Sequence, residues 1–237
     1  MTPRTKEQNE EIRLRRLTQI RKAAADVFLN KGPLLEIRDV ATQAELGYGT
    51  VYHYYSNKGD LLHDLLWDAL ERAGGWLEVP PEAPLKVTQE VARAAAADTG
   101  NSAATDSRSE SRETADAAEL GPVAASGVRL LELWAEDHAL YLLHKLAGEG
   151  FASLPEARSA PLSAAFHREV LAPFATLLET GRVAEGAAAS GGNAAEPPNR
   201  LQRAEMLLAA LVGCASLSLR RGKLHEEAMD IVRFLKL

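Results

Sequence analysis

Apolar residues recur along much of the chain with the period of an α-helix, and turn-forming or polar segments separate these stripes. The first stripe consists of Leu17, Ile20, Ala24, Val27 and Phe28. Residues with this spacing share one helix face, so we expect a helix from about Leu14 to Asn30 that ends at Gly32-Pro33. The later stripes have the same period, and together they predict an all-α fold.

Residues 37–61 are the most informative stretch, because two short helical patterns are joined there by a tight turn. The inner faces consist of Val40, Ala41 and Ala44 in the first pattern, Val51 and Tyr55 in the second, and Leu46 between them. We therefore interpret Tyr55 as a core residue. Together with the preceding helix, this stretch predicts a three-helix domain that contains a helix-turn-helix.

The outer face of the second short helix is rich in hydroxyl and aromatic groups and has no carboxylate. It consists of Tyr48, Thr50, Tyr52, His53 and Tyr54. Such side chains bond phosphate oxygens and contact base edges, so they suit the major groove of DNA. Aromatic packing is the alternative, although three consecutive residues cannot all point inward from one helix. Lys58 follows at the start of the next helix, where its charge and the helix N-terminus both favour a phosphate.

The run Gly49-Thr50-Val51-Tyr52-His53-Tyr54-Tyr55, followed by Asn57-Lys58 and a leucine-rich helix, resembles the TetR family of transcriptional regulators. The resemblance extends over roughly residues 14 to 75. It implies a homodimer, most often a repressor, that binds a palindromic DNA operator and releases it when a small-molecule effector enters the helical body. It also implies a DNA contact at Arg38, for which an ion pair with Asp39 is the alternative.

Two residues in the turn depart from the family's pattern. Glu45 stands where the family usually has glycine, and Gly47 stands where it usually has a capping serine or threonine. A non-glycine residue with positive φ costs about 1 to 2 kcal/mol, and glycine caps a helix slightly less well than serine. We therefore expect a somewhat less stable turn of the same kind.

Composition changes along the chain divide it into two domains. Residues 1–60 are expected to form an N-terminal arm and the helix-turn-helix domain, and residues 61–237 a helical domain for ligand binding and dimerisation. Residues 98–119 contain no aromatic residue and no Leu, Ile or Val, which predicts a flexible insertion at 98–120. Residues 184–199 are alanine- and glycine-rich and predict a second linker.

Aromatic and histidine side chains of the second domain are candidates for the wall of a ligand cavity. We expect one helix over 57–77, one over 128–147, and one or two over 155–182, where Pro173 favours a kink. The candidate ligand-binding residues are His63, Trp67, Trp134, His138, Tyr141, Phe166 and His167. Of these, Trp134, His138 and Tyr141 are expected to share one helix face. Core packing with satisfied histidines is the alternative.

The last two helical stripes are too apolar for a helix that faces water on one side. Residues 206–219 are almost uninterruptedly apolar, and a matching stripe ends the chain. Two such helices from each subunit are expected to form a four-helix dimer interface, as in the family. Its candidate residues are Leu207, Ala210, Leu211, Cys214, Leu217, Ile231 and Leu235. Burial within a monomer core is the alternative.

The net charge of −6 argues against nucleic acid until its distribution is considered. Residues 1–60 carry ten Lys/Arg and eight Asp/Glu, whereas residues 61–237 carry 17 and 25. This asymmetry is typical of a small DNA-binding head on an acidic body. Residues 1–22 have a net charge of +4 and are expected to add phosphate contacts, with a solvated tail as the alternative.

Other classes of protein and site receive little support. The single cysteine, Cys214, excludes an intramolecular disulfide, and the scattered histidines predict neither a metal site nor a cofactor. No signal peptide or membrane-spanning run is apparent, so we expect a cytoplasmic protein. No catalytic motif is apparent, so we do not expect an enzyme. A ligand-binding helical protein or enzyme with a vestigial helix-turn-helix remains the alternative.

Overall fold

The computed structural model describes residues 6–73, 121–184 and 199–237. In these ranges every regular element is a helix, which confirms the predicted all-α fold. The predicted insertion and almost all of the predicted linker at 184–199 lie outside the described residues, as do the first five residues.

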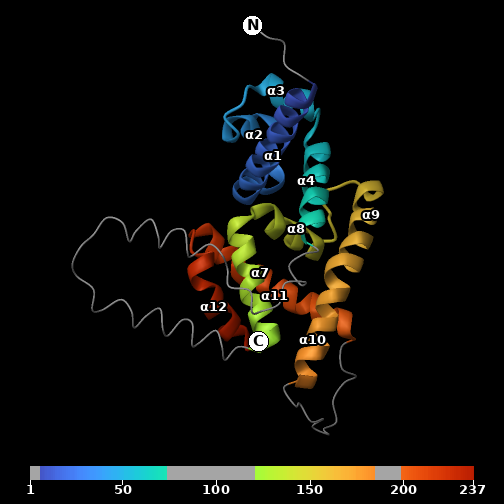
Figure 1. Ribbon diagram of the computed structural model, residues 1–237, viewed down its shortest axis with the longest axis vertical. Coiled ribbons are helices and arrows are strands. Elements are labelled where there is room, and N and C mark those ends of the chain that lie inside the picture. Colours follow the sequence, from blue (N-terminus) through green and yellow to red (C-terminus); the bar gives the residue numbers. More distant parts are fainter. Residues whose placement is uncertain (1–5, 74–120, 185–198) are drawn as a thin grey trace, which may run out of the picture.

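The N-terminal domain, called the head below, lies at one end of the molecule (Figure 1). Its helices are α1 (Lys6–Lys31), α2 (Ile37–Gln43), α3 (Tyr48–Tyr54) and α4 (Lys58–Ala73), with a 3-10 turn η1 (Gly32–Leu34) after α1. Ile20, Val40 and Val51 have no exposed surface, and they join α1, α2 and α3 in one core. The helix α4 then runs from the head into the rest of the chain (Figure 1).

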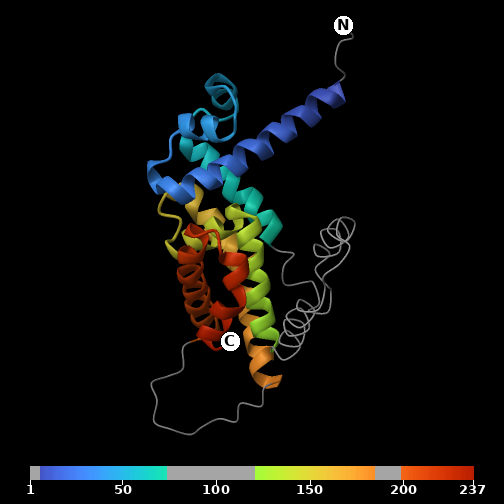
Figure 2. The same ribbon diagram turned by 90° about the vertical axis from the view of Figure 1, so that its left-hand side faces the viewer.

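The start of α1 differs from the prediction. The helix begins at Lys6 rather than near Leu14, and its first turns project away from the rest of the described chain (Figure 2). Ion pairs of the kind that stabilise exposed helices explain the extension: Glu10 pairs with Arg13 at 2.9 Å and Glu11 with Arg15 at 4.0 Å. Most of the basic segment is therefore helical.

The turn between α2 and α3 has the predicted irregularity. Glu45 adopts a φ of 53°, in the left-handed region, and the backbone N–H of Leu46 donates to the carbonyl of Ala41 at 2.9 Å. Gly47 occupies the N-cap of α3 and offers no side-chain acceptor. Glu45 and Gly47, the two departures from the family's pattern, therefore both lie in the turn between α2 and α3.

The second part of the chain, called the body below, is a bundle of helices under the head (Figure 1). Its elements are α7 (Pro122–Glu136), α8 (His138–Gly148), α9 (Glu156–Phe166), the π-helical segment η3 (His167–Leu171), α10 (Ala172–Ala184), α11 (Arg200–Arg220) and α12 (Leu224–Leu235). The helix α8 packs against α1, α4, α7 and α11, so it is central to the bundle.

The single helix predicted over 128–147 is wrong, because Asp137 divides it into α7 and α8. Asp137 is extended, with φ −126° and ψ 95°, and its carboxylate accepts a hydrogen bond from the Ala139 N–H at 2.9 Å. An aspartate at this position caps the new helix. Residues on opposite sides of the break therefore do not share one continuous helix face.

Just before Pro173, where the sequence predicts a kink, the helix is π-helical over the segment η3. Proline has no N–H to donate to the fourth residue before it, and the helix widens over His167–Leu171 just before Pro173. The chain then continues as α10. None of the described helices is long and apolar enough to cross a membrane.

Candidate nucleic-acid interface

The helix α3 presents its aromatic residues to solvent, while Val51 and Tyr55 are buried as predicted. The rings of Tyr48 and Tyr52 are about half exposed and stack at a centroid distance of 5.7 Å. Thr50 and His53 are exposed as well. Tyr54 is half-buried and packs against the core, with its ring edge on to His53. Four of the five predicted groups on this face are therefore open to a partner.

Arg38 on α2 extends the same surface. Its guanidinium lies 6.0 Å from the centre of the Tyr48 ring. The acid that the sequence offered as its ion-pair partner, Asp39, binds the ammonium of Lys31 at 2.6 Å instead. Lys31 also lowers the pKa of the Asp39 carboxyl below its ordinary value by donating this hydrogen bond.

An open hollow lies between the start of α2 and α3. It is lined by Leu35, Glu36, Ile37, Arg38, Tyr48, Tyr52, Ser56 and Lys58. The structure therefore brings Arg38, Tyr48, Tyr52 and Lys58 together around one depression. Ser56 and Glu36 also line the hollow but were not among the predicted DNA-contacting residues. Ser56 adds an exposed hydroxyl, whereas Glu36 adds a carboxylate that disfavours a phosphate close to it.

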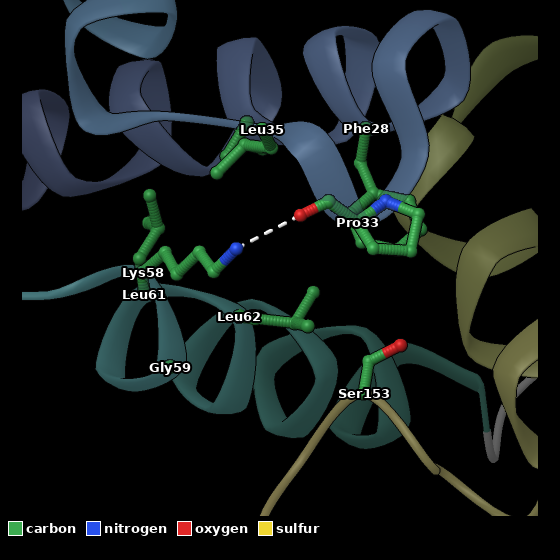
Figure 3. Close-up of a pocket in the computed structure, with 9 residues that line it drawn as sticks. Phe28, Pro33, Leu35, Lys58, Gly59, Leu61, Leu62 and Ser153 are labelled. Atoms are coloured by element: carbon green, nitrogen blue, oxygen red, sulfur yellow. Dashed lines mark hydrogen bonds between the residues drawn. The ribbon is translucent and has the colours of Figure 1, made fainter.

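The ammonium of Lys58 is held at the start of α4, where it donates to the carbonyl of Pro33 at 2.8 Å (Figure 3). An ammonium has three donors, so two remain for another acceptor. Asn57 caps the helix by accepting a hydrogen bond from the Asp60 N–H at 2.9 Å. Beneath Lys58 lies a small, mostly apolar cavity bounded by α1, η1, α4 and Ser153 of the α8–α9 connection (Figure 3).

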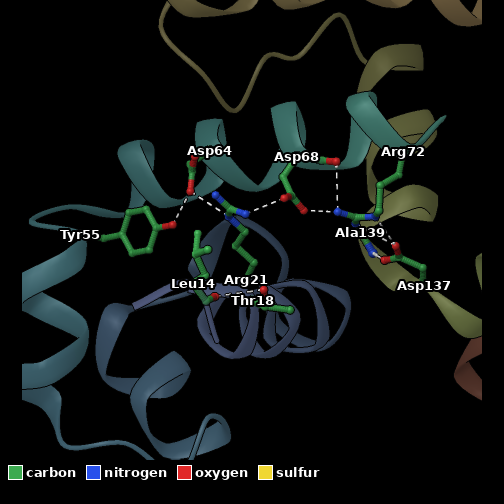
Figure 4. Close-up of polar contacts among 9 residues, drawn as sticks. All are labelled: Leu14, Thr18, Arg21, Tyr55, Asp64, Asp68, Arg72, Asp137 and Ala139. Carbon is green, nitrogen blue, oxygen red and sulfur yellow. Dashed lines mark hydrogen bonds and ion pairs between the residues drawn. The ribbon is translucent and has the colours of Figure 1, made fainter. Parts of the chain in front are cut away.

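A chain of polar contacts anchors the end of α3 to α4, α1 and the body (Figure 4). The Tyr55 hydroxyl donates to Asp64, which also accepts from Arg21 at 2.9 Å. Arg21 reaches Asp68 at 2.5 Å, and Asp68 in turn accepts from Arg72. Arg72 donates to Asp137 at 2.8 Å, so the chain ends at the cap of α8. Burial and the bond to Asp64 raise the pKa of Tyr55, which keeps its hydroxyl protonated.

A hydrogen bond and an ion pair also connect the head with the body. His138 Nδ1 lies 2.6 Å from the Asp26 carboxylate of α1. Arg158 of α9 lies 2.6 Å from Asp60 and, by donating to it, lowers the pKa of the Asp60 carboxyl. Together with Arg72 and Asp137, these contacts join α1 and α4 to α8 and α9.

Three of the candidate ligand-binding residues meet in a buried aromatic cluster. The Trp134 and Tyr141 rings lie edge on at 5.7 Å, and Phe166 joins them through His144. Phe151 packs against Phe166 on the edge of the cluster. His144 and Phe151 were not among the candidate ligand-binding residues. His144 was considered only as a possible metal ligand, because the leucine-rich sequence around it predicts a plain core helix. All five residues of this cluster are buried.

The other candidate ligand-binding residues lie elsewhere. Trp67 donates to His63 Nε2 at 2.9 Å, one turn away on α4. His138 faces α1 rather than Trp134, because the break at Asp137 interrupts the expected helix face. His167 is exposed on η3. Within the described ranges, no three His, Cys, Asp or Glu residues are grouped so that they could hold a metal ion.

The candidate dimer residues on α11 and α12 have unequal exposure. Leu217 is 64% exposed, and Leu207, Ala210, Cys214 and Leu235 are half-buried. Leu211 and Ile231 are already covered by the chain's own core, so they are not available to a partner. Met206 and Phe234 were not selected from the sequence, yet they are 62% and 77% exposed.

Comparisons with known proteins agree with this geometry. Residues 20–65 match the family model of bacterial regulatory proteins, tetR family, which confirms the resemblance seen in the sequence. No curated protein sequence matches the chain.

Similar solved structures cover nearly the whole chain. The fatty acid degradation regulator FadR from Bacillus halodurans is 15% identical with a TM-score of 0.50, over 93% of this chain and 94% of its own. The TetR family transcriptional regulator PfmR from Thermus thermophilus is 14% identical with a TM-score of 0.50, over 91% of this chain and 92% of its own. A tetR family regulatory protein from Rhodococcus RHA1 is 15% identical with a TM-score of 0.50, over 92% and 94%. At such identities the likeness establishes the fold.

Proposed function

We propose that this chain, whose residues 20–65 match the tetR family, is a homodimeric transcriptional repressor that binds a palindromic operator and releases it when a small molecule binds in the body. The observation that carries the proposal is the exposed surface of α3 and its surroundings. There Arg38, Tyr48, Tyr52 and Lys58 line one hollow, and Thr50 and His53 lie beside it.

Each group on this surface has a role that its chemistry supports. Arg38 and Lys58 are cations and bind phosphate oxygens, which position the head on the duplex. Tyr48, Tyr52, Thr50 and His53 offer hydroxyl or ring N–H groups and apolar edges to the bases in the major groove. Tyr54 is half-buried and supports His53 rather than reading DNA.

The exposed apolar residues of the last two helices support the proposed dimer. Met206, Ala209, Gly213 and Leu217 are exposed and spaced by three or four residues, so they form a stripe along α11. Half-buried Leu207, Ala210 and Cys214 border it, and half-buried Leu235 and exposed Phe234 extend the apolar surface on α12. Two heads placed by such a dimer contact major grooves about one helical turn apart, which requires a palindromic operator.

Release by an effector requires that the ligand favour one arrangement of the two heads over another. The hydrogen bond between Asp26 and His138, and the ion pairs of Asp60 with Arg158 and of Arg72 with Asp137, join each head to α8 and α9. A ligand that shifts these body helices changes the spacing of the heads, and binding to a fixed operator spacing is then lost.

A mobility-shift assay with the DNA upstream of the protein's own gene tests the DNA-binding surface. The double variant Tyr52→Ala with Lys58→Ala is expected to weaken binding by about 30-fold or more, since a base contact and a phosphate contact are lost in each head. Thr180→Ala on α10, which is exposed and far along the chain from the head, serves as the matched control. Unchanged binding by the double variant would refute the proposed interface.

Sedimentation tests the dimer separately. Met206→Glu with Leu217→Glu places charges in the proposed interface and is expected to give a monomer at micromolar concentration. Ala160→Glu, an exposed position on α9, is expected to remain dimeric. A wild-type monomer, or a dimer that survives both glutamates, would exclude this interface.

A further inference from the structure

His144 is a buried polar residue inside an aromatic cluster of the body. It is 4% exposed, and its ring lies 5.0 Å from that of Trp134 and 5.5 Å from that of Phe166. Phe151 packs edge on against Phe166 at 6.3 Å, and Tyr141 packs edge on against Trp134. The rings come from α7, α8, α9 and the α8–α9 connection, so the cluster lies where four segments meet.

The hydrogen bonds of His144 determine its tautomer. Nδ1 lies 2.8 Å from the carbonyl oxygen of Leu140, which can only accept, so Nδ1 carries the proton. The Trp134 indole N–H lies 3.3 Å from the same Nδ1. One nitrogen cannot both donate to Leu140 and accept from Trp134, so we assign the hydrogen bond to the shorter contact, and the Trp134 N–H then has no acceptor. Burial lowers the pKa of His144 to about 4, and the ring is therefore neutral at pH 7.

The other ring nitrogen, Nε2, is then an acceptor without a donor. It has no hydrogen-bond partner in the structure although it is buried. Buried polar atoms in native proteins nearly always have a partner, because an unpaired one forfeits its bonds to water. The lone pair on Nε2 therefore indicates a hydrogen-bond donor that is supplied from outside the chain.

Two backbone irregularities border the same cluster. Phe151 adopts a φ of 54°, a conformation that bulky residues rarely adopt, and the π-helical segment η3 begins directly after Phe166. Strained φ values and π-helical turns are enriched at ligand sites. Both irregularities therefore lie directly beside the cluster, one at Phe151 and one next to Phe166.

We propose that the effector is an uncharged, flat, largely apolar molecule with a hydroxyl group, of the phenol class, and that its hydroxyl donates to His144 Nε2. The proposal rests on the effector-released function above and names the ligand class of its body site. The aromatic rings of Trp134, Phe151 and Phe166 supply apolar walls for a flat ring. They carry no charge, so a carboxylate would lose its hydration without compensation.

Titration of the full-length protein with phenol and with toluene tests this site. The two probes have similar shape, but only phenol has a hydroxyl. We expect wild type to bind phenol at least fivefold more tightly than toluene, and phenol but not toluene to shift the 15N resonance of His144 Nε2. His144→Phe keeps the aromatic volume and removes the acceptor, and it is expected to abolish the preference.

The outcomes separate clearly. Equal binding of both probes by wild type, a preference that survives in His144→Phe, or no binding of phenol would each overturn the proposal. If His144→Phe is poorly folded, the Nε2 resonance of wild type decides alone. A mobility-shift assay of operator binding without phenol tests the proposed function independently. If the protein does not bind the operator, the proposed regulator function is refuted. If it binds the operator but does not respond to phenol, only this ligand site is refuted.

Discussion

At the scale of single residues, Glu45 shows how a local departure from a pattern translates into free energy. Its φ of 53° places the backbone in the left-handed region, which glycine adopts without strain. The neighbouring N-cap is Gly47, where a Cβ would lie 3.7 Å from the Thr50 hydroxyl, an ordinary contact distance. The turn thus has a strained residue where glycine fits and a glycine where serine fits.

Replacing each of these two residues gives the first prediction. Glu45→Gly is expected to raise the free energy of unfolding by about 0.5–1 kcal/mol, since relief of strain exceeds the added freedom of the unfolded chain. Gly47→Ser adds a few tenths of a kcal/mol by capping α3. Urea unfolding of each variant measures both. Destabilisation by Glu45→Gly would show that the glutamate side chain contributes more than its backbone conformation costs.

The neutral histidine of the body gives a second prediction, on pH. Burial lowers the pKa of His144 from 6.5 in the unfolded chain to about 4. Between these values the unfolded state binds more protons, so stability rises with pH and is lost as pH falls from about 6.5 towards 4. Between pH 7 and pH 5 wild type should lose roughly 2 kcal/mol more than His144→Phe. Urea unfolding at equal protein concentration measures this, with the exposed His225→Gln as control.

At the scale of elements, the head could be predicted from sequence and several features of the body could not. The helix-turn-helix is formed by residues close together in the sequence, so the spacing of Val40, Ala44 and Val51 is enough to predict it. The break at Asp137 was missed because leucines continue on both sides and suggest one stripe. His144 was not selected as a ligand-binding residue for the same reason. Contacts such as Arg21 with Asp68 join residues 47 positions apart, and no periodicity encodes them.

The polar chain between these elements gives a third prediction. Asp68 accepts from both Arg21 and Arg72, so Asp68→Asn leaves two partly buried guanidinium groups with weaker acceptors. We expect a loss of about 1–2 kcal/mol in stability, reduced by partial solvent exposure. Glu71→Gln, an exposed neighbour on α4, is expected to change stability by less than about 0.5 kcal/mol. If thermal unfolding shows the same loss of stability for Asp68→Asn and Glu71→Gln, these polar contacts contribute nothing specific to stability.

At the scale of the whole molecule, the charges are arranged so that binding to DNA depends on a few cations. The chain has a net charge of −6, and residues 1–60 contribute only a small positive excess. Lys58 and Arg38 are the cations that line the hollow beside α3, and Glu36 partly offsets them. A single head therefore gains little from counterion release, which makes the dimer and the helical start of α1 important for affinity.

Salt dependence turns this arrangement into the last prediction. Each phosphate contact contributes about 0.9 to the slope of log affinity against log salt concentration, so Lys58→Ala should lower the slope of a dimer by about two. Tyr52→Ala removes a base contact and should weaken operator binding with little change in slope. Lys145→Ala, in the body, loses an ion pair with Glu149 and should change neither. Fluorescence anisotropy between about 50 and 200 mM salt measures all three. If Lys58→Ala has the same slope as wild type, Lys58 does not contact a phosphate. Its only role would then be structural, through its hydrogen bond to the Pro33 carbonyl.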